Sequence, residues 1–189
     1  MDLYPGKYIL VSAHREENVD REETFFGLMN AINAMAERYR IPVIYSTHPR
    51  TKKWIEARQF QFHPLVQNLK PFSYSDYNCL QKNAYCVLSD SGTLSEESAM
   101  LRFPCVLIRT STERPEVLDK GAVIIGGIRE QDIGQAIELA RSMYEHHEEV
   151  VLSPDYQDTN VSVKVIKIIQ SYTKIVNEMV WRKKVDSFG

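Results

Sequence analysis

The chain has 189 residues, 43% of them hydrophobic and 25% charged, which suits one globular domain with a sizeable core. Its formal net charge of -2 supplies no basic field, so we expect no nucleic-acid partner. Because no apolar run approaches the ~20 residues that span a bilayer and the chain start lacks a signal-peptide pattern, we expect a cytoplasmic protein without membrane contact.

Short apolar runs alternate along the chain with longer segments of helical period, beginning soon after a turn-like Tyr4-Pro5-Gly6. This alternation is typical of βαβ units, and it predicts an α/β fold with a Rossmann-like parallel sheet and helices on both faces. The early turn resembles a linker and indicates a fragment of a longer protein. The expected strands cover residues 8–13, 43–47, 65–68, 86–89, 105–108 and 122–125.

Apolar side chains at three- and four-residue spacing predict three long helices. A second helix covers about residues 132–144, and a third is expected over residues 155–184. The apolar face of the third helix needs a partner, either this domain or a domain missing from the chain. The first helix lies between the first two strands, and its core-facing stripe is formed by Phe25, Leu28, Met29, Ile32, Met35, Ala36 and Tyr39.

The three cysteines, Cys79, Cys86 and Cys105, include no Cys-x-x-Cys pair and lie in or beside apolar runs. This pattern is typical of small core residues in a reducing compartment. We expect no metal site.

Polar residues follow four of the expected strands, at the edge where parallel sheets bind their ligands. Ligand contacts are therefore expected from one rim of the sheet. The four segments are His14-Arg15-Glu16-Glu17-Asn18, His48-Pro49-Arg50, Asp90-Ser91-Gly92-Thr93, and Arg109 with Thr112-Glu113-Arg114-Pro115-Glu116.

The segment around Ser91 closes a strand and opens a helix, where backbone amides are unpaired. Gly92 permits close backbone approach, so this turn is a candidate anion site with Arg114 as the added cation. The alternative is a structural cap, in which Ser91 or Thr93 closes the helix and Glu96 completes a capping box.

Glu97 borders the inward face of the same helix, about one turn beyond the candidate anion site. A carboxylate there needs hydrogen-bond donors, and a ribose diol next to a bound pyrophosphate would supply two. An ordinary ion pair with Arg102 or another basic residue is the alternative.

Two histidines and one aromatic residue complete the candidate set. His14 and His48 each follow a strand, and together on one rim they indicate ligand contacts. Tyr77 either packs in the core or offers a stacking face to a base. The chain lacks Gly-x-Gly-x-x-Gly, Walker and Gly-x-Ser-x-Gly motifs, which argues against redox, kinase and hydrolase functions.

Taken together and in order, these motifs resemble the C-terminal domain of non-hydrolysing UDP-N-acetylglucosamine 2-epimerases, over roughly residues 8–127. The resemblance implies a two-domain, glycosyltransferase-B-like enzyme with UDP bound in the cleft between domains. Residues 1–189 would then form a single UDP-binding domain whose N-terminal partner domain is missing. It also implies a UDP-sugar as ligand, a homodimeric full-length enzyme and no cofactor.

The resemblance also assigns roles to individual residues. Ser91 and Gly92 correspond to the diphosphate-binding serine and glycine, Glu97 to the ribose-binding glutamate, and Arg114 to the phosphate-binding arginine. His14 is the histidine of the His-Arg motif and the candidate catalytic residue, and Tyr77 corresponds to the uracil-stacking aromatic. Arg15 and His48 correspond to a sugar-side or regulatory pocket.

Two positions depart from the commonest family pattern: Glu16 stands where arginine is frequent, and Thr93 stands where a second glycine is frequent. These departures favour the branch that forms UDP-N-acetyl-L-fucosamine for capsular or other surface polysaccharide over UDP-N-acetylglucosamine as substrate. Two further hypotheses are a glycosyltransferase of similar architecture and a non-catalytic UDP-sugar-binding or interaction domain.

Overall fold

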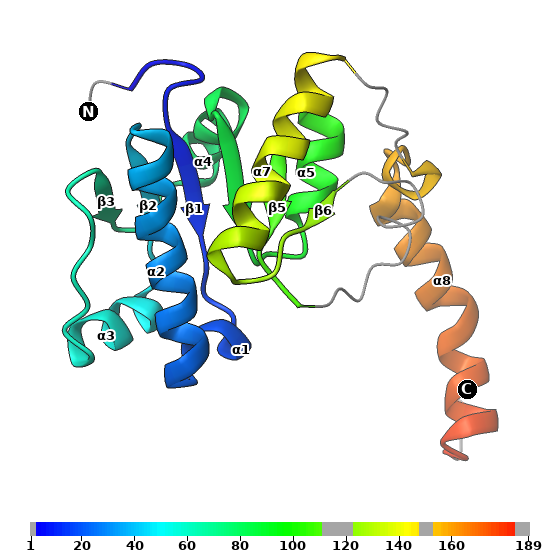
Figure 1. Ribbon diagram of the computed structural model, residues 1–189. Helices are drawn as coiled ribbons and strands as arrows, with labels where there is room; N and C mark the ends of the chain where they lie inside the picture. Colours follow the sequence, from blue (N-terminus) through cyan, green and yellow to red (C-terminus); the bar gives the residue numbers. More distant parts are fainter. Residues whose placement is uncertain (1–2, 111–122, 148–152, 184–189) are drawn as a thin grey trace. The chain divides into compact units, whose positions relative to one another are not determined.

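The computed structural model describes residues 3–110, 123–147 and 153–183 (Figure 1). The chain divides into two compact units, Met1–Ser153 and Pro154–Gly189. No helix among the described residues is both long and apolar enough to cross a membrane.

The first unit contains a six-stranded parallel sheet with the order β3-β2-β1-β4-β5-β6, which confirms the predicted α/β fold. The order reverses between β1 and β4, and open sheets of this kind bind ligands at that point. Ser12 and Ser89 are paired there, so the two strands end level with each other. The strands are β1 (Ile9–Ser12), β2 (Val43–Ser46), β3 (Val66–Leu69), β4 (Cys86–Ser89), β5 (Cys105–Leu107) and β6 (Ile124–Ile125).

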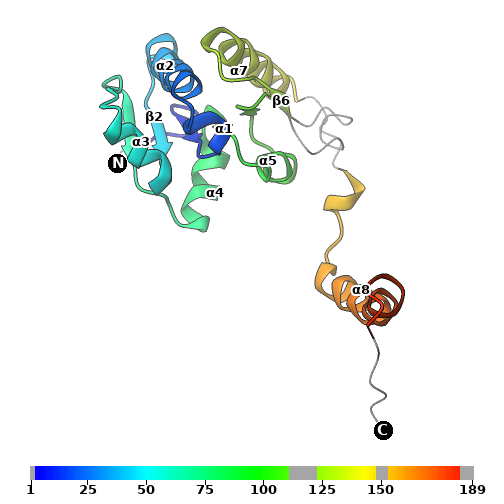
Figure 2. The ribbon, with the colours of Figure 1, turned by 90° about the horizontal axis from the view of Figure 1, so that it is seen from below.

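Helices cover both faces of this sheet. Figure 2 shows α2 and α7 on one face and α4 and α5 on the other. The α2 and α7 helices also contact each other, so they form a continuous layer. The described helices of the first unit are α1 (Glu16–Val19), α2 (Glu22–Tyr39), α3 (Pro49–Ala57), α4 (Tyr74–Asn83), α5 (Leu94–Leu101) and α7 (Glu130–Glu145).

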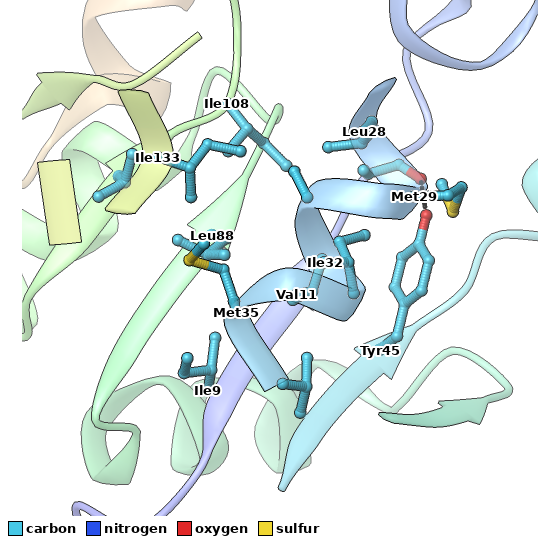
Figure 3. Packing of buried hydrophobic residues seen from close by; sticks show 14 of the residues in the cluster. Ile9, Val11, Leu28, Met29, Ile32, Met35, Tyr45, Leu88, Ile108 and Ile133 are labelled. Atoms are coloured by element: carbon cyan, nitrogen blue, oxygen red, sulfur yellow. Dashed lines mark hydrogen bonds between the residues drawn. The ribbon is translucent and has the colours of Figure 1, made fainter. Parts of the chain in front are cut away.

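The core lies between α2 and the central strands (Figure 3). The predicted stripe of α2 is buried from Phe25 to Ala36, while Tyr39 is half-buried at its end. Beneath it, Tyr45 is fully buried and its hydroxyl donates a 3.0 Å hydrogen bond to the Ala13 carbonyl. Burial raises the pKa of Tyr45, so the phenol stays neutral and ties the end of β1 to β2.

Two of the three cysteines are core residues and one is not. Cys86 and Cys105 are buried, and burial raises the pKa of Cys105 to about 12. Cys79 is exposed, contrary to the prediction. The reason is that α4 turns a different side chain inward, because its buried residue is Gln81, two positions further along.

The α-helix of the second unit is shorter than the predicted range of 155–184. A 3₁₀ turn (η1, Pro154–Tyr156) comes first, and the polar residues 157–160 separate it from α8 (Val161–Ile175). A π-helical turn (η2, Val176–Val180) continues α8 until Arg182 adopts a left-handed backbone with φ of 50°. None of the residues of α8 is buried among the described part of the chain.

Gly126, directly after β6, lies too close to its neighbours to accept a side chain. A Cβ there would stand 2.5 Å from Val106 Cγ1 and 3.1 Å from Ala136 Cβ. We expect Gly126→Ala to lower the free energy of unfolding by about 1–3 kcal/mol, because the buried β5–α7 packing must shift. Chemical denaturation of the purified chain measures the change.

Gly27 provides the matched control for this substitution. It is exposed within α2, and a Cβ built on it meets nothing within 4 Å. Gly27→Ala should therefore raise the free energy of unfolding by about 0.5–1 kcal/mol through helix propensity. Equal effects of the two substitutions would contradict the packing argument.

Candidate functional site

Asp90, the first residue after β4, joins the ends of β1 and β4. Its side chain is fully buried. Oδ2 accepts hydrogen bonds from the backbone amides of His14 (2.9 Å) and Arg15 (2.8 Å) and from Asn18 Nδ2 (3.1 Å). These bonds compensate the buried charge and fix the segment after β1 against the end of β4.

The structure brings His14 and His48 together at this rim, with their ring centroids 5.6 Å apart. His14 Nδ1 lies 3.3 Å from Asp90 Oδ1, and its side chain is 42% exposed. His48 precedes α3, and its Nδ1 accepts a 3.2 Å hydrogen bond from the Arg50 amide. The predicted adjacency of the two strand ends therefore places both imidazoles in one surface region.

Arg50 belongs to an ion-pair cluster beside the histidines. Its Nη1 lies 2.6 Å from Glu16 Oε1, and its Nη2 lies 2.5 Å from Asp20 Oδ2. The hydrogen bonds to Asp20 and then Glu16 raise the pKa of Arg50. Glu16, the unusual residue of the His-Arg motif, therefore shares its ion-pair partner with Asp20.

The start of α5 does not form the structural cap considered above. Thr93 occupies the N-cap position but makes no side-chain hydrogen bond to the helix amides. Its Oγ1 instead lies 3.0 Å from Ser91 Oγ, and the Ser91 amide donates to Ser89 Oγ at 3.1 Å. The first turn of α5 therefore does not receive a cap from Thr93, and the two hydroxyls lie side by side at its opening.

Glu97 is held by a neutral amide. Gln81 Nε2 donates a 2.7 Å hydrogen bond to Glu97 Oε2, and Gln81 is 1% exposed. Among the described ion pairs none includes Glu97, so the alternative pair with Arg102 is not formed; Arg102 instead ends α5 with a left-handed backbone. Among the described residues, the Gln81 amide is the hydrogen-bond donor to this half-buried side chain.

The hydroxyl of Tyr77, on α4, reaches the ends of the same two strands. Burial raises its pKa to about 12, while hydrogen bonds with Ser12 and Ser89 act in the opposite direction. These serines end β1 and β4, so the hydroxyl of Tyr77 is anchored between the two strands. The phenol is neutral near pH 7.

Residues 2–170 match the family described as UDP-N-acetylglucosamine 2-epimerase. The chain belongs to this family. It is 35% identical to the UDP-N-acetylglucosamine 2-epimerase of Methanocaldococcus jannaschii over 136 residues, which are 70% of this chain and 37% of the relative. The chain therefore spans well under half the length of this epimerase.

Solved structures of epimerases share the fold. That of UDP-N-acetylglucosamine 2-epimerase from Rickettsia bellii matches with a TM-score of 0.77 and 34% identity, covering 96% of this chain and 48% of that one. The M. jannaschii UDP-GlcNAc 2-epimerase, solved in complex with UDP-GlcNAc and UDP, matches with a TM-score of 0.75 and 28% identity over 87% of this chain and 45% of that one.

With the family established, the predicted site residues divide into two groups. His14, Arg15, His48, Ser91, Gly92, Glu97 and Tyr77 lie on segments that follow or flank β1, β2 and β4. Arg114 lies outside the described residues, as does the whole motif from Thr112 to Glu116. Among the residues that can be described, no group of three or more His, Cys, Asp or Glu side chains could hold a metal.

Asn18 and Arg109 were expected at the rim without a specific role, and Gln81 was not predicted as part of this epimerase-family site. Asn18 is buried and bonds Ile108 O (3.0 Å) as well as Asp90, and Arg109 is 1% exposed with its Nε 3.4 Å from Glu17 Oε1. Both follow apolar strands, which was an available signal. Gln81 carried no such signal, because it lies within a helix.

Proposed function

We propose that this chain is the UDP-binding half of a UDP-N-acetylhexosamine 2-epimerase. The observation that carries the proposal is Glu97, a half-buried carboxylate held by the neutral Gln81 amide about one turn inside α5. The described residues form no ion pair with this carboxylate, which is suited to accept hydrogen bonds from a ribose diol.

The other ligand contacts follow from this position. The diphosphate would lie at the start of α5 against Ser91 and Gly92, where unpaired amides attract anions, with Arg114 adding a positive charge. Tyr77 would face the uracil. Arg15 and His48 would lie on the sugar side or in a regulatory pocket, and His14 would act next to the reacting sugar.

The reaction would invert C2 by elimination and re-addition of UDP, without a cofactor. A base removes the C2 proton, the C1–O bond breaks to release UDP and a glycal, and UDP returns after the opposite face is protonated. This half would stabilise the growing diphosphate charge through amides and Arg114. Charge-assisted hydrogen bonds contribute ~1.5–3 kcal/mol each, so two or three lower the barrier substantially.

The N-terminal domain would supply the carboxylates for proton transfer, and we expect this chain alone to be nearly inactive. The same domain would cover the exposed apolar side chains of α8, among them Ile166, Ile169 and Tyr172. The full-length enzyme would be a cytoplasmic homodimer.

The substrate would be UDP-GlcNAc or UDP-2-acetamido-2,6-dideoxy-L-talose. The Glu16 carboxylate pairs with Arg50, which also pairs with Asp20, so this position presents an acidic ion-pair cluster where arginine is frequent in the family. Thr93 adds a hydroxyl at the opening of α5. These two differences favour the 6-deoxy sugar and a role in capsule or surface polysaccharide synthesis.

Solvent deuterium tests the reaction. Full-length enzyme incubated with each UDP-sugar in D₂O should incorporate deuterium at C2, because the proton is lost and regained there, and proton NMR would show loss of the H2 signal. A glycosyltransferase would leave H2 in place and transfer the sugar to an acceptor, and that result would refute the epimerase.

Calorimetric titration tests the nucleotide site of this chain directly. We expect saturable UDP binding, with Arg114→Ala weakening it roughly 10- to 100-fold through the loss of one charge-assisted contact of ~1.5–3 kcal/mol. Arg129→Ala, at the exposed start of α7, removes the same charge and should leave the affinity unchanged. Equal losses in both variants would remove Arg114 from the site.

A further inference from the structure

His14 and Asp90 form a pair whose chemistry the nucleotide site does not explain. The Asp90 carboxylate uses Oδ2 for the backbone amides of His14 and Arg15 and for Asn18. Oδ1 accepts no hydrogen bond from the described residues, although the side chain is fully buried. The polar atom facing it is His14 Nδ1, at 3.3 Å.

This contact selects one form of the imidazole. A carboxylate only accepts hydrogen bonds, so attraction to Oδ1 requires a proton on Nδ1. The other neutral tautomer would direct a lone pair at a fully buried negative charge. The distance exceeds the ~2.7–2.9 Å of an aligned charge-assisted bond, and such contacts in enzymes often tighten only when substrate is bound.

We propose that Asp90 is a positioning residue that fixes the Nδ1–H tautomer of His14, so that Nε2 is the ring nitrogen presented to the ligand. Nδ1 is turned to the buried carboxylate, and the partly exposed ring carries Nε2 on its other side. A neutral His14 can then accept a proton or hydrogen bond through Nε2. The relevance of Nε2 to sugar chemistry rests on the proposed function, whereas the tautomer does not.

In His48 the two ring nitrogens have the opposite roles, so the two histidines can be compared directly. Its Nδ1 accepts from the Arg50 amide, so the proton of a neutral His48 ring lies on Nε2. With ring centroids 5.6 Å apart, the two histidines would thus offer one accepting and one donating ring nitrogen at the same rim. Such a pair can hold one hydroxyl group from both sides, donating to it and accepting from it.

Asp90→Asn tests the assignment without removing the acceptor that the fold needs. The asparagine oxygen can take the place of Oδ2 beneath the amides of His14 and Arg15, which leaves its NH₂ group facing His14 Nδ1. An NH₂ group donates, so the ring should switch to the Nε2–H tautomer. In a serine protease, exchanging the aspartate beside the catalytic histidine for asparagine likewise gives the wrong tautomer.

The measurement is long-range proton–nitrogen NMR on the ¹⁵N-labelled chain, recorded at rising pH until the rings are neutral. His14→Gln identifies the His14 signals. We expect the protonated nitrogen of His14 to be Nδ1 in the unmodified chain and Nε2 in Asp90→Asn, while His48 stays in its Nε2–H form in both. Asp132→Asn, which removes an exposed carboxylate on α7, should change neither ring.

A proton on His14 Nε2 in the unmodified chain would overturn the proposal, and this result needs no variant to fold. An unchanged Nδ1–H form in Asp90→Asn would also overturn it, as would a switch in Asp132→Asn. Because no nucleotide is added, these outcomes are separate from the UDP titration. A chain with the expected tautomers but no UDP affinity would retain the role of Asp90 and refute the proposed function.

Discussion

Replacing Asp90 by alanine is expected to lower the free energy of unfolding of this chain by about 3–5 kcal/mol, a large part of the ~5–15 kcal/mol typical of a domain. Alanine leaves the amides of His14 and Arg15 and the side chain of Asn18 without their acceptor in a fully buried place. Each buried donor left unpaired costs about 1–3 kcal/mol, and water can relieve only part of it.

Denaturant titration followed by circular dichroism would measure this loss. Asp132→Ala is the control, because its carboxylate is exposed in the first turn of α7 and should contribute less than about 1 kcal/mol. Asp90→Asn should fall between the two, since its oxygen can still accept. A loss below about 1 kcal/mol in Asp90→Ala would show that the Oδ2 hydrogen bonds do not hold the ends of β1 and β4 together.

Glu97 should determine the preference of the chain for ribose over deoxyribose. If its carboxylate accepts from the 2′-hydroxyl of UDP, the unmodified chain should bind UDP roughly 10- to 100-fold more tightly than 2′-deoxy-UDP, which is one charge-assisted bond of ~1.5–3 kcal/mol. In Glu97→Gln this ratio should fall toward one. The neutral amide loses the charge while it keeps the size and an oxygen for Gln81 Nε2.

Titration of both nucleotides into both chains separates recognition from a general loss of structure. A misfolded variant would lose both affinities, whereas a lost contact changes their ratio. Glu130→Gln, at the exposed start of α7, provides the matched substitution and should keep the original ratio. An unchanged ratio in Glu97→Gln would place the ribose elsewhere.

The sheet could be predicted because the pattern that produces it lies within short segments of the sequence. Apolar runs of four to six residues separated by a helical stripe, such as that of α2, leave few alternatives to a parallel sheet. The same logic placed His14, His48 and Ser91 at one rim, since carboxyl ends of parallel strands share an edge.

The remaining contacts could not be predicted because they depend on packing between distant segments. The buried residue of α4 is the polar Gln81, so the helix lacks an apolar stripe. For this reason neither the helix nor the partner of Glu97 could be predicted. The sequence predicts Asp90 at the end of a strand, but the amides that donate hydrogen bonds to it follow a different strand, β1. Thr93 fitted a capping box by spacing alone, yet its hydroxyl turned to Ser91.

The long-range contacts of Asp90 and Asn18 also constrain the order in which this part of the chain can form. His14 and Asp90 are 76 residues apart, and Asn18 and Ile108 are 90 apart, so the site exists only after long loops have closed. The β1–β2–β3 half can assemble during synthesis before Asp90 has emerged, because N-terminal segments form first. If the chain binds nucleotide there as proposed, the nucleotide cannot act as a template for that half and would stabilise the chain only once β4 has joined β1.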